Sequence, residues 1–381
     1  MKVLFMTSRD ITNPEWAGGD LYHFEVAKRL VRDGDEVTML CNGYKGCKNQ
    51  EELQGIKIIR VRRGIFRIFS NFYAYRRYLR GKQDIIVEEA EGPAGPLFSF
   101  MYAKEPVVIM WHQLGKTIYF NQFPYPIALG LLVLEKIYIT LARKCHIIVP
   151  SQARTCEFLK AGFPKDRIIV VPAAFTLEAM PKRSNRSKLS TKYFLILGKI
   201  RRYKAYHHAI EALKMLRDRG EKCSLIIAGK KGEGRYYEKV KRLIINYDLQ
   251  NSVFLRLDIS EDEKVKLLSQ ALALIVTSPI EGFSIVSVEA NALGIPVIAT
   301  DGVPDEVISD RFNGIKYMFG DIPALAEAMS KLLHDEKLRE TLAKNARRSS
   351  ARFSWDKSAK LFREVLKNIL NRERTFKQKL R

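Results

Sequence analysis

The stretch TSPIEGFSIVSVEANALG, residues 277–294, is the part of this 381-residue chain from which we infer its fold. It follows an apolar run, Ala271–Val276, that is typical of a buried strand. Turn-forming residues come next, and apolar residues at helical spacing then lead to Gly294, a common helix stop. A strand, a tight loop and a helix in this order indicate an α/β protein.

The loop and the helix start carry groups that suit an anionic sugar ligand. A helix start attracts a diphosphate through its free N–H groups and its dipole, and Gly282 lets a ligand approach the backbone. Glu281 stands in the loop, where a carboxylate suits sugar hydroxyls, and Glu289 lies on the helix. Two other interpretations stay open at this point. The glutamates are merely solvated, or they form a glycosidase pair, which needs carboxyl groups about 5–10 Å apart.

Glu281-Gly282-Phe283, with Glu289 after it, resembles the E-x7-E signature of retaining glycosyltransferases of the glycogen-synthase-like superfamily, the group 1 or family 4 class. The resemblance implies an α/β chain of GT-B fold, with two Rossmann-like domains facing across a cleft. It implies transfer of a sugar from a nucleotide diphosphate sugar with retained anomeric configuration and without a protein nucleophile. We expect no cofactor and no metal, because the donor regions contain no Asp-x-Asp motif and lysines can supply the positive charge. Glu281 would hold the donor sugar and Glu289 the ribose.

A second motif, Gly198-Lys199 followed by Lys204-Ala205, resembles the family pattern G-R-x4-K-G, whose cations hold the donor diphosphate. Lys stands here in place of Arg, so the planar fork of a guanidinium is lost, and Ala stands in place of Gly. The alternative is a solvated basic loop. By the same resemblance, the donor-binding residues are Gly18, Gly19, Lys199, Lys204, Gly282, Phe283, Ser284, Ile285 and Glu289.

His112 is the second predicted catalytic residue. It stands just after an expected strand, Pro106–Met110, at the end where open α/β sheets bind ligands. An isolated histidine there is more often packed or solvated. The family carries a histidine after this strand, so the resemblance implies a contact with the donor sugar or with charge near the reacting carbon.

The chain divides into two halves that each alternate strand and helix. A polar, broken segment, Ala173–Thr191, is typical of an interdomain linker. We therefore expect an acceptor domain over residues 1–176 and a donor domain over residues 190–354. We expect residues 355–381 to form a helix that crosses back to the first domain, followed by a basic tail.

The charge balance predicts an anionic partner. Lys and Arg number 65 against 42 Asp and Glu, which gives a net charge of +23 and suggests lipid head groups, nucleic acid or an acidic substrate. Five scattered cysteines without a C-x-x-C pair indicate free thiols in a reducing compartment. The longest apolar run, Pro126–Leu134, is cut by Glu135 and Lys136, so we expect no spanning segment.

Arg60–Lys82 interleaves basic and aromatic residues, a composition typical of a helix lying in a membrane interface. A core helix with a solvated basic face and a stacking surface for single-stranded nucleic acid are the alternatives. Lys116–Lys144 is apolar and aromatic, and either lines a lipid-acceptor groove or packs inside. The predicted membrane or acceptor contacts are Arg67, Phe69, Phe72, Arg76 and Arg77.

These observations together predict a glycosyltransferase that acts on a lipid-linked or glycan acceptor. The expected location is cytoplasmic, peripheral at the inner face of the cell membrane, with an anionic membrane surface as partner and no nucleic acid. A basic nucleic-acid- or membrane-binding GT-B-like scaffold without catalysis is the alternative. A nucleic-acid binder would leave the Glu281 motif without a role and would lose affinity steeply with salt.

Overall fold

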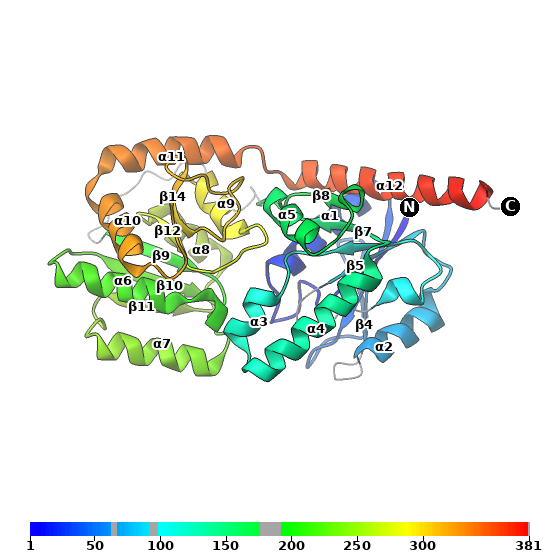
Figure 1. Ribbon diagram of the computed structural model, residues 1–381, viewed down its shortest axis with the longest axis horizontal. Coiled ribbons are helices and arrows are strands. Elements are labelled where there is room, and N and C mark those ends of the chain that lie inside the picture. The colour runs from blue at the N-terminus through cyan, green and yellow to red at the C-terminus, as the bar shows by residue number, and fades with distance from the viewer. Residues whose placement is uncertain (62–66, 91–97, 176–191, 380–381) are drawn as a thin grey trace. The chain divides into compact units, whose positions relative to one another are not determined.

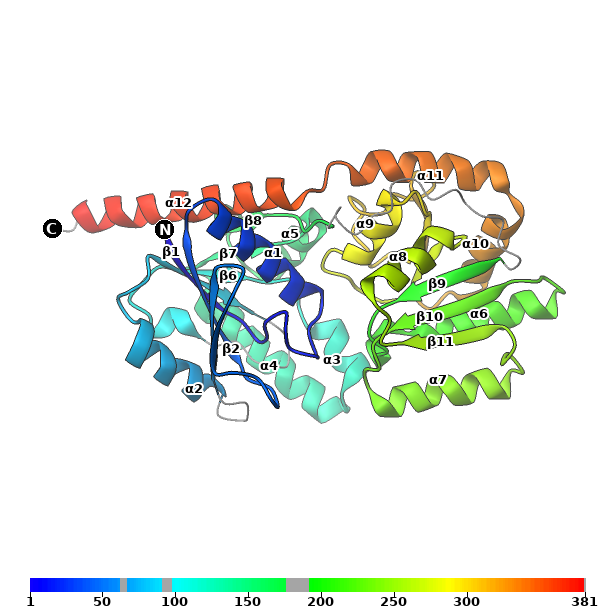
Figure 2. The ribbon, with the colours of Figure 1, turned by 180° about the vertical axis from the view of Figure 1, so that it is seen from behind.

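The computed structural model describes residues 1–61, 67–90, 98–175 and 192–379, and the chain forms two compact units. Unit 1 comprises Met1–Tyr119, Pro124–Ala174 and Ser354–Arg381. Unit 2 comprises Phe120–Phe123 and Phe175–Phe353. Each unit contains one largely or wholly parallel sheet with helices packed on it, which is the α/β class that the sequence predicts (Figures 1 and 2).

Unit 1 is built on an eight-stranded sheet in which only the edge pair β3–β4 is antiparallel. In sheet order its strands are β3 (Gln50–Leu53), β4 (Ile56–Val61), β2 (Glu36–Asn42), β1 (Lys2–Met6), β5 (Ile85–Glu89), β6 (Val107–Met110), β7 (His146–Val149) and β8 (Ile168–Val170). The central strands are nearly continuous apolar runs because helices cover both faces of a parallel sheet. In β1, every residue after Lys2 is buried.

Alternation along β1 assigns the helices of unit 1 to the two faces of its sheet. Phe5 stacks on Phe362 of the C-terminal helix, with ring centroids 6.0 Å apart, on the face where the first helix also packs (Figure 2). Leu4 and Met6 point to the other face, in one core cluster with Tyr75. The helices are α1 (Gly18–Arg32), α2 (Arg67–Ala74), α3 (Lys116–Gln122), of which Lys116–Tyr119 belong to this unit, α4 (Tyr125–Ala142), α5 (Gln152–Lys160) and α12 (Trp355–Lys379).

Unit 2 is built on a six-stranded, all-parallel sheet. In sheet order its strands are β11 (Val253–Leu257), β10 (Ser224–Gly229), β9 (Tyr193–Leu197), β12 (Leu274–Val276), β13 (Val297–Thr300) and β14 (Gly314–Tyr317). Its helices are α6 (Tyr206–Asp218), α7 (Gly234–Asn246), α8 (Glu261–Gln270), α9 (Ile285–Ala292), α10 (Ile322–His334) and α11 (Glu336–Ser350). The expected strand, loop and helix around residues 271–294 are therefore β12 and α9.

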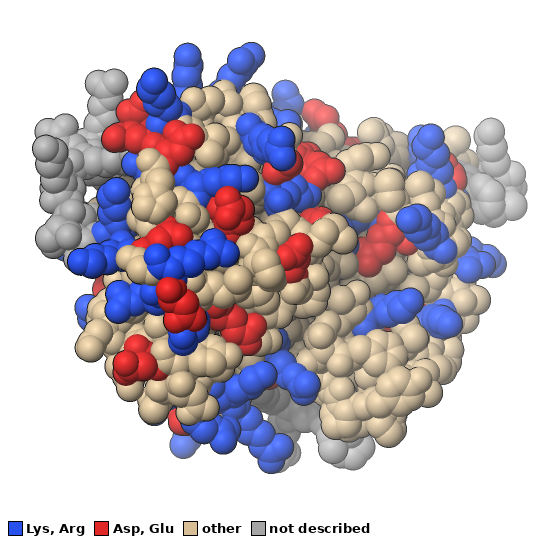
Figure 3. All heavy atoms as spheres, turned by 60° about the vertical axis from the view of Figure 1, so that its left-hand side comes forward, with Lys and Arg blue, Asp and Glu red and all other residues tan. Residues whose placement is uncertain are grey.

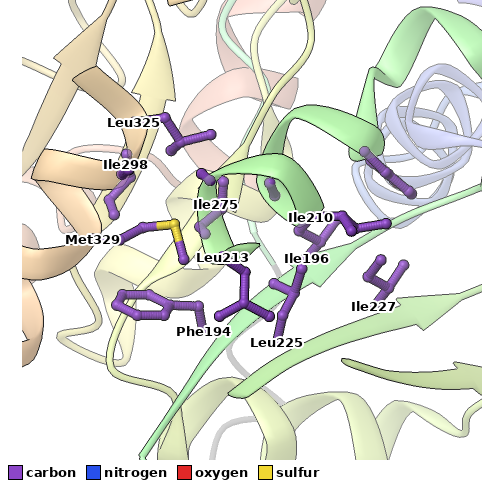
Figure 4. Close-up of a cluster of buried hydrophobic side chains, with 14 of the residues drawn as sticks. Phe194, Ile196, Ile210, Leu213, Leu225, Ile227, Ile275, Ile298, Leu325 and Met329 are labelled. Carbon is purple, nitrogen blue, oxygen red and sulfur yellow. The ribbon is translucent and has the colours of Figure 1, made fainter. Parts of the chain in front are cut away.

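A single apolar cluster holds α6 and α10 against this sheet (Figure 4). Phe194 of β9 and Ile275 of β12 meet Leu213 of α6 and Met329 of α10 there, and all four side chains are essentially inaccessible to solvent. Because β9 and β12 are neighbours at the centre of the sheet, the loops after them emerge side by side from a rigid base.

The structure corrects the interpretation of Arg60–Lys82 as one basic helix. Arg60 belongs to β4, and its fully buried guanidinium pairs with Asp10 at 2.8 Å and also with Glu51. It is therefore a structural residue, and its charge is neutralised within unit 1. Residues 62–66 lie outside the described residues, and only α2 and the π-helical turn η1 (Tyr75–Leu79) belong to the predicted helix.

Among the described residues, one helix is long and apolar enough to cross a membrane, by length and composition only. It is α4, which has 18 residues with a mean hydropathy of 1.5, and 28% of it is buried. The sequence expectation of no spanning segment considered only uninterrupted apolar runs. The helix continues through Glu135 and Lys136, which interrupt the apolar run in the sequence, and its length and composition alone do not decide whether it spans a membrane.

Candidate active site

Lys204 and Glu281 form an ion pair between the two loops that follow β9 and β12. Lys204 Nζ lies 2.5 Å from Glu281 Oε1, and the side chains are 22% and 14% exposed. Thr277 Oγ1 donates a hydrogen bond to the Lys204 carbonyl oxygen at 2.5 Å and ties the loops together. The structure thus brings together two predicted site residues that are 77 positions apart in the sequence.

The ion pair fixes the charge on Lys204. Burial alone would lower the pKa of this amine, but the Glu281 carboxylate outweighs burial and raises the pKa of Lys204 above its ordinary value. An ammonium group has three N–H donors, so Lys204 can bind a phosphate oxygen while it holds Glu281. The second oxygen of Glu281 can meanwhile accept a hydrogen bond from a sugar hydroxyl.

The predicted phosphate-facing helix start is the beginning of α9, at Ile285. Ser284 precedes it with left-handed backbone, φ 76°, and its hydroxyl lies 2.7 Å from that of Ser287. The first hydrogen bond of this turn runs from the Ser287 N–H to the Ser284 carbonyl oxygen at 3.0 Å, and the N–H groups before it have no acceptor within the helix. Phe283 is buried edge-to-face against Phe353, with centroids 5.1 Å apart, so its backbone rather than its ring can meet a ligand.

Glu289 is largely buried and not an exposed helix residue. Its Oε1 pairs with Lys264 Nζ of α8 at 3.0 Å, whereas its Oε2 has no hydrogen-bond partner among the described residues. Burial raises the pKa of Glu289, and the Lys264 ammonium group opposes that rise. A buried acceptor without a donor is costly, so this oxygen suits a ligand hydroxyl such as that of a ribose.

Lys199 stands at the end of β9, in the same loop as Lys204. Its carbonyl oxygen accepts a hydrogen bond from Tyr206 at 3.2 Å. The backbones of Gly198 and Gly229 approach so closely that a Cβ on Gly229 would lie 2.3 Å from the Gly198 carbonyl oxygen. This contact fixes the turn that carries both predicted phosphate-binding lysines.

Ala205 adopts a left-handed backbone, φ 49°, at the position where the resembled motif has Gly. A residue with Cβ is strained there by about 1–2 kcal/mol. We expect Ala205→Gly to raise the free energy of unfolding by about 0.5–1 kcal/mol, after the entropy that Gly adds to the unfolded chain. Urea denaturation checks this, with Ala324→Gly in α10 as a control that should lower stability. A less stable Ala205→Gly variant would contradict the argument from strain.

In unit 1, α1 begins at Gly18, where the Ala17 N–H donates to Asp20 Oδ2 at 2.7 Å. The helix brings Gly19 against His112, which follows β6. A Cβ on Gly19 would lie 2.9 Å from His112 Nε2, so only Gly leaves room for this imidazole. The structure thus places Gly18, Gly19 and His112 together at the carboxyl ends of the strands of unit 1.

Glu89 and His23 surround the imidazole of His112. Alternation along β5 turns Glu88 toward α4 and Glu89 toward α1, where Glu89 Oε1 lies 3.4 Å from His23 Nδ1 and 4.0 Å from His112 Nε2. One ligand atom from each of the three residues lies within 4.8 Å of the others. Burial and the neighbouring His112 hold the pKa of His23 well below its usual value.

Two family models match this chain, one over each half. Residues 16–178 match the model described as Glycosyltransferase Family 4, and residues 181–349 match the model described as Glycosyl transferases group 1. The chain belongs to the family 4, group 1 glycosyltransferases. This identification confirms the resemblance read from Glu281 and Glu289.

Curated relatives of this glycosyltransferase are distant. An uncharacterized glycosyltransferase of Methanocaldococcus jannaschii is 32% identical over 139 residues, which cover 36% of this chain and 39% of the relative. The capsular polysaccharide biosynthesis glycosyltransferase CapM of Staphylococcus aureus is 25% identical over 62% of this chain and 66% of its own length. The matched segments therefore span less than two thirds of these relatives.

Solved structures share the fold over nearly the whole glycosyltransferase. Sucrose-phosphate synthase from Thermosynechococcus elongatus has a TM-score of 0.82 at 19% identity and covers 97% of this chain and 99% of that chain. Anabaena HepE in complex with UDP-glucose has a TM-score of 0.80 at 21% identity and covers 97% and 100%. The predicted GT-B class, with two Rossmann-like sheets, is thereby confirmed.

Three residues that contact predicted site residues were not themselves predicted from the sequence: Lys264 in unit 2, and Glu89 and His23 in unit 1. Lys264 stands on α8 next to Glu261, which it contacts at 2.6 Å, and therefore resembles an ordinary surface pair in the sequence. In the sequence Glu89 stands in a run of acidic residues that leads to Gly92 and Pro93, which is typical of a loop, but it is a buried residue of β5. Helical spacing from Gly19 places His23 on the same side of α1, and this was the one available signal.

The predicted membrane contacts of the glycosyltransferase are only partly at the surface. Phe69 is 69% exposed, and Arg76 and Arg77 are exposed with it. Phe72 is half-buried and packs edge-to-face on Tyr102 at 5.0 Å. The side chain of Arg67 lies outside the described residues.

Proposed function

We propose that this chain transfers a sugar from a nucleotide diphosphate sugar, with retained configuration, to a lipid-linked or glycan acceptor at an anionic membrane surface. The Lys204–Glu281 ion pair carries the proposal. The pair places a positive charge and a carboxylate close to the start of α9. The positive charge and the helix start suit the diphosphate of a nucleotide sugar, and the carboxylate suits the hydroxyls of the hexose that is joined to it.

In the proposed mechanism, negative charge develops on the leaving diphosphate as the glycosidic bond breaks. Lys204 and Lys199 stabilise that charge, together with the backbone N–H groups of Phe283, Ser284 and Ile285. Glu281 holds hydroxyls of the donor sugar, and Gly282 allows close approach. The leaving phosphate takes the proton of the acceptor hydroxyl, so the mechanism requires no protein nucleophile. Glu289 binds the ribose, and contact with the donor sugar is the role proposed for His112.

A thermal-shift panel of UDP-, GDP- and ADP-sugars tests the donor assignment. A ligand at 100 times its Kd stabilises the folded protein by about 2.7 kcal/mol, which is a measurable rise in Tm. Because HepE was solved with UDP-glucose, that sugar is the first candidate. One nucleotide series should raise the Tm, and proton NMR of the product should show the anomeric configuration of the donor. No shift with any nucleotide sugar would contradict the proposal.

We expect sugar transfer to survive EDTA, because two lysines and a helix start supply the positive charge that a metal ion supplies elsewhere. Activity before and after chelation measures this. Loss of activity on chelation that Zn²⁺ or Mn²⁺ restores would contradict the expectation. If His23→Gln abolished that restoration, the metal would lie between His23, Glu89 and His112, whose donor atoms suit a transition metal.

Nucleic-acid binding is the rival function, and the one face shown in Figure 3 gives it little support. On the face shown in Figure 3, Asp and Glu side chains lie among the Lys and Arg side chains, so this face does not present a field of one sign. Binding to a phosphate backbone needs such a field, and the logarithm of its Kd would rise linearly with the logarithm of the salt concentration. A gel-shift titration with single-stranded DNA and RNA that showed tight, salt-sensitive binding would revive this alternative.

A further inference from the structure

Helix α4 carries an apolar face on the outside of unit 1 (Figure 1). Six of its aliphatic side chains are each 40–53% exposed: Ile127, Leu129, Val133, Leu134, Ile137 and Leu141. Apart from Tyr125 at its start, the exposed positions carry only two polar side chains, Lys136 and Thr140. A surface helix of a water-soluble domain normally shows its polar side to solvent, so α4 has the reverse pattern.

The inward side of α4 is polar as well as apolar and is held firmly. Glu135 is buried and accepts hydrogen bonds from the Gly115 N–H at 2.7 Å and from the Tyr119 hydroxyl at 3.2 Å. Tyr138 donates to Glu88 Oε1 at 2.7 Å and packs edge-to-face on Trp111 at 5.2 Å. The only acidic side chain of the helix is therefore turned away from solvent.

These inward bonds decide how α4 can meet a lipid. A helix of 18 residues is about 27 Å long, close to the thickness of a bilayer core. Spanning the bilayer would require α4 to leave unit 1 and would place Glu135 in hydrocarbon without its partners Gly115 and Tyr119. Lying in the interface plane buries the outward face and leaves every inward bond intact.

Charge selects the occupant of the apolar face. Lys136 borders it, and exposed Arg143 and Lys144 follow the end of the helix. An anionic bilayer attracts such cations by about 1 kcal/mol each. A second copy of the chain would bring another net charge of +23 to the same place, so self-association through this face is opposed.

We propose that α4 is the membrane-contacting element of this protein and lies in the plane of an anionic bilayer, with its six exposed aliphatic side chains in the acyl boundary. This deepens the proposed function by naming the partner of unit 1, and it rests on that function for an acceptor presented at the membrane. It differs from the prediction made from sequence, which gave the membrane contact to Arg60–Lys82, the segment that contains α2 and η1. Phe69, Arg76 and Arg77 then contribute at most additional charge and aromatic contact.

Flotation of the full chain with lipid vesicles tests the proposal. We expect wild type to float with vesicles of phosphatidylcholine and phosphatidylglycerol, and about tenfold less with phosphatidylcholine alone. Val133→Ser with Ile137→Ser should weaken partitioning by about tenfold or more, because the apolar contact is lost. The matched double variant Ile245→Ser with Leu361→Ser changes two exposed aliphatic residues of α7 and α12 and should float like wild type.

Several results would overturn the proposal. The first is unchanged flotation of the Val133→Ser, Ile137→Ser variant. The second is a larger loss of flotation from Phe69→Ser with Arg76→Ser than from that variant. The third is resistance of vesicle-bound wild type to extraction by alkaline carbonate, which would indicate a spanning helix. A dimer in analytical ultracentrifugation that the α4 variant abolishes would assign the face to a second copy.

The donor-induced thermal shift is measured on the same samples. A rise in Tm with a nucleotide sugar but no flotation would contradict only the proposal for α4. Flotation without any rise in Tm would contradict the proposed function.

Discussion

Replacing Lys204 with alanine is expected to lower kcat for sugar transfer by about 10²- to 10³-fold while the protein stays folded. The loss falls on kcat because negative charge on the diphosphate grows as the bond to the sugar breaks, so Lys204 binds the transition state more strongly than the donor. Lys204→Arg keeps the charge and should recover part of the rate. Steady-state kinetics with circular dichroism as a check of folding measure the effect.

The ion pair supplies a matched control for the Lys204 variant. Lys214 also pairs with a carboxylate, Asp218, but on the exposed surface of α6. Surface pairs contribute little, so Lys214→Ala should change neither rate nor stability appreciably. Glu281→Gln should lower kcat as strongly as Lys204→Ala, and the double variant should be less impaired than the product of the two effects. A Lys204→Ala enzyme within threefold of wild type would refute this role.

Gly19→Ala is expected to lower kcat by about 10²-fold, because its Cβ would displace the imidazole of His112 and a shift of about 1 Å in a reacting group has an effect of this size. His112→Ala should have an effect of the same order. Combining the two should add little, since both remove the same contact. Single-turnover kinetics of the three variants measure this.

Gly234→Ala is the control for the Gly19 variant. Gly234 also lies in the first turn of a helix, α7, and a Cβ there would meet nothing within 4 Å. We expect this variant to keep the activity of wild type. Additive losses from Gly19→Ala and His112→Ala would show that Gly19 acts in some way other than through His112.

The sequence predicted the parts of this site that depend on local pattern. Glu281, Gly282 and the helix after them follow from turn chemistry and periodicity, and Lys204 follows from a motif at fixed spacing. The contact between Lys204 and Glu281 follows because the loops after neighbouring parallel strands emerge at one edge of the sheet. Such features depend on a few residues that are adjacent in the sequence or on the order of the strands.

Other features depend on partners that are distant in the sequence. Arg60 stands in a basic segment and resembles a surface cation in the sequence. Its partner Asp10 lies 50 residues away, and the two side chains pair inside the protein. In the sequence Glu289 resembles an exposed helix residue, because no pattern near it indicates the contact with Lys264. For α4, periodicity shows which side chains share a face, but only packing shows that the apolar face is the one turned outward.

Isothermal titration of the free nucleoside diphosphate and of its sugar, using the nucleotide that the thermal-shift panel selects, tests the central claim most directly. Lys204→Ala should weaken both ligands to a similar extent, since both contain the diphosphate. Glu281→Gln should weaken the nucleotide sugar by about tenfold more than the free diphosphate, because only the sugar meets that carboxylate. Equal affinities of wild type and both variants for both ligands would contradict a donor site at Lys204 and Glu281.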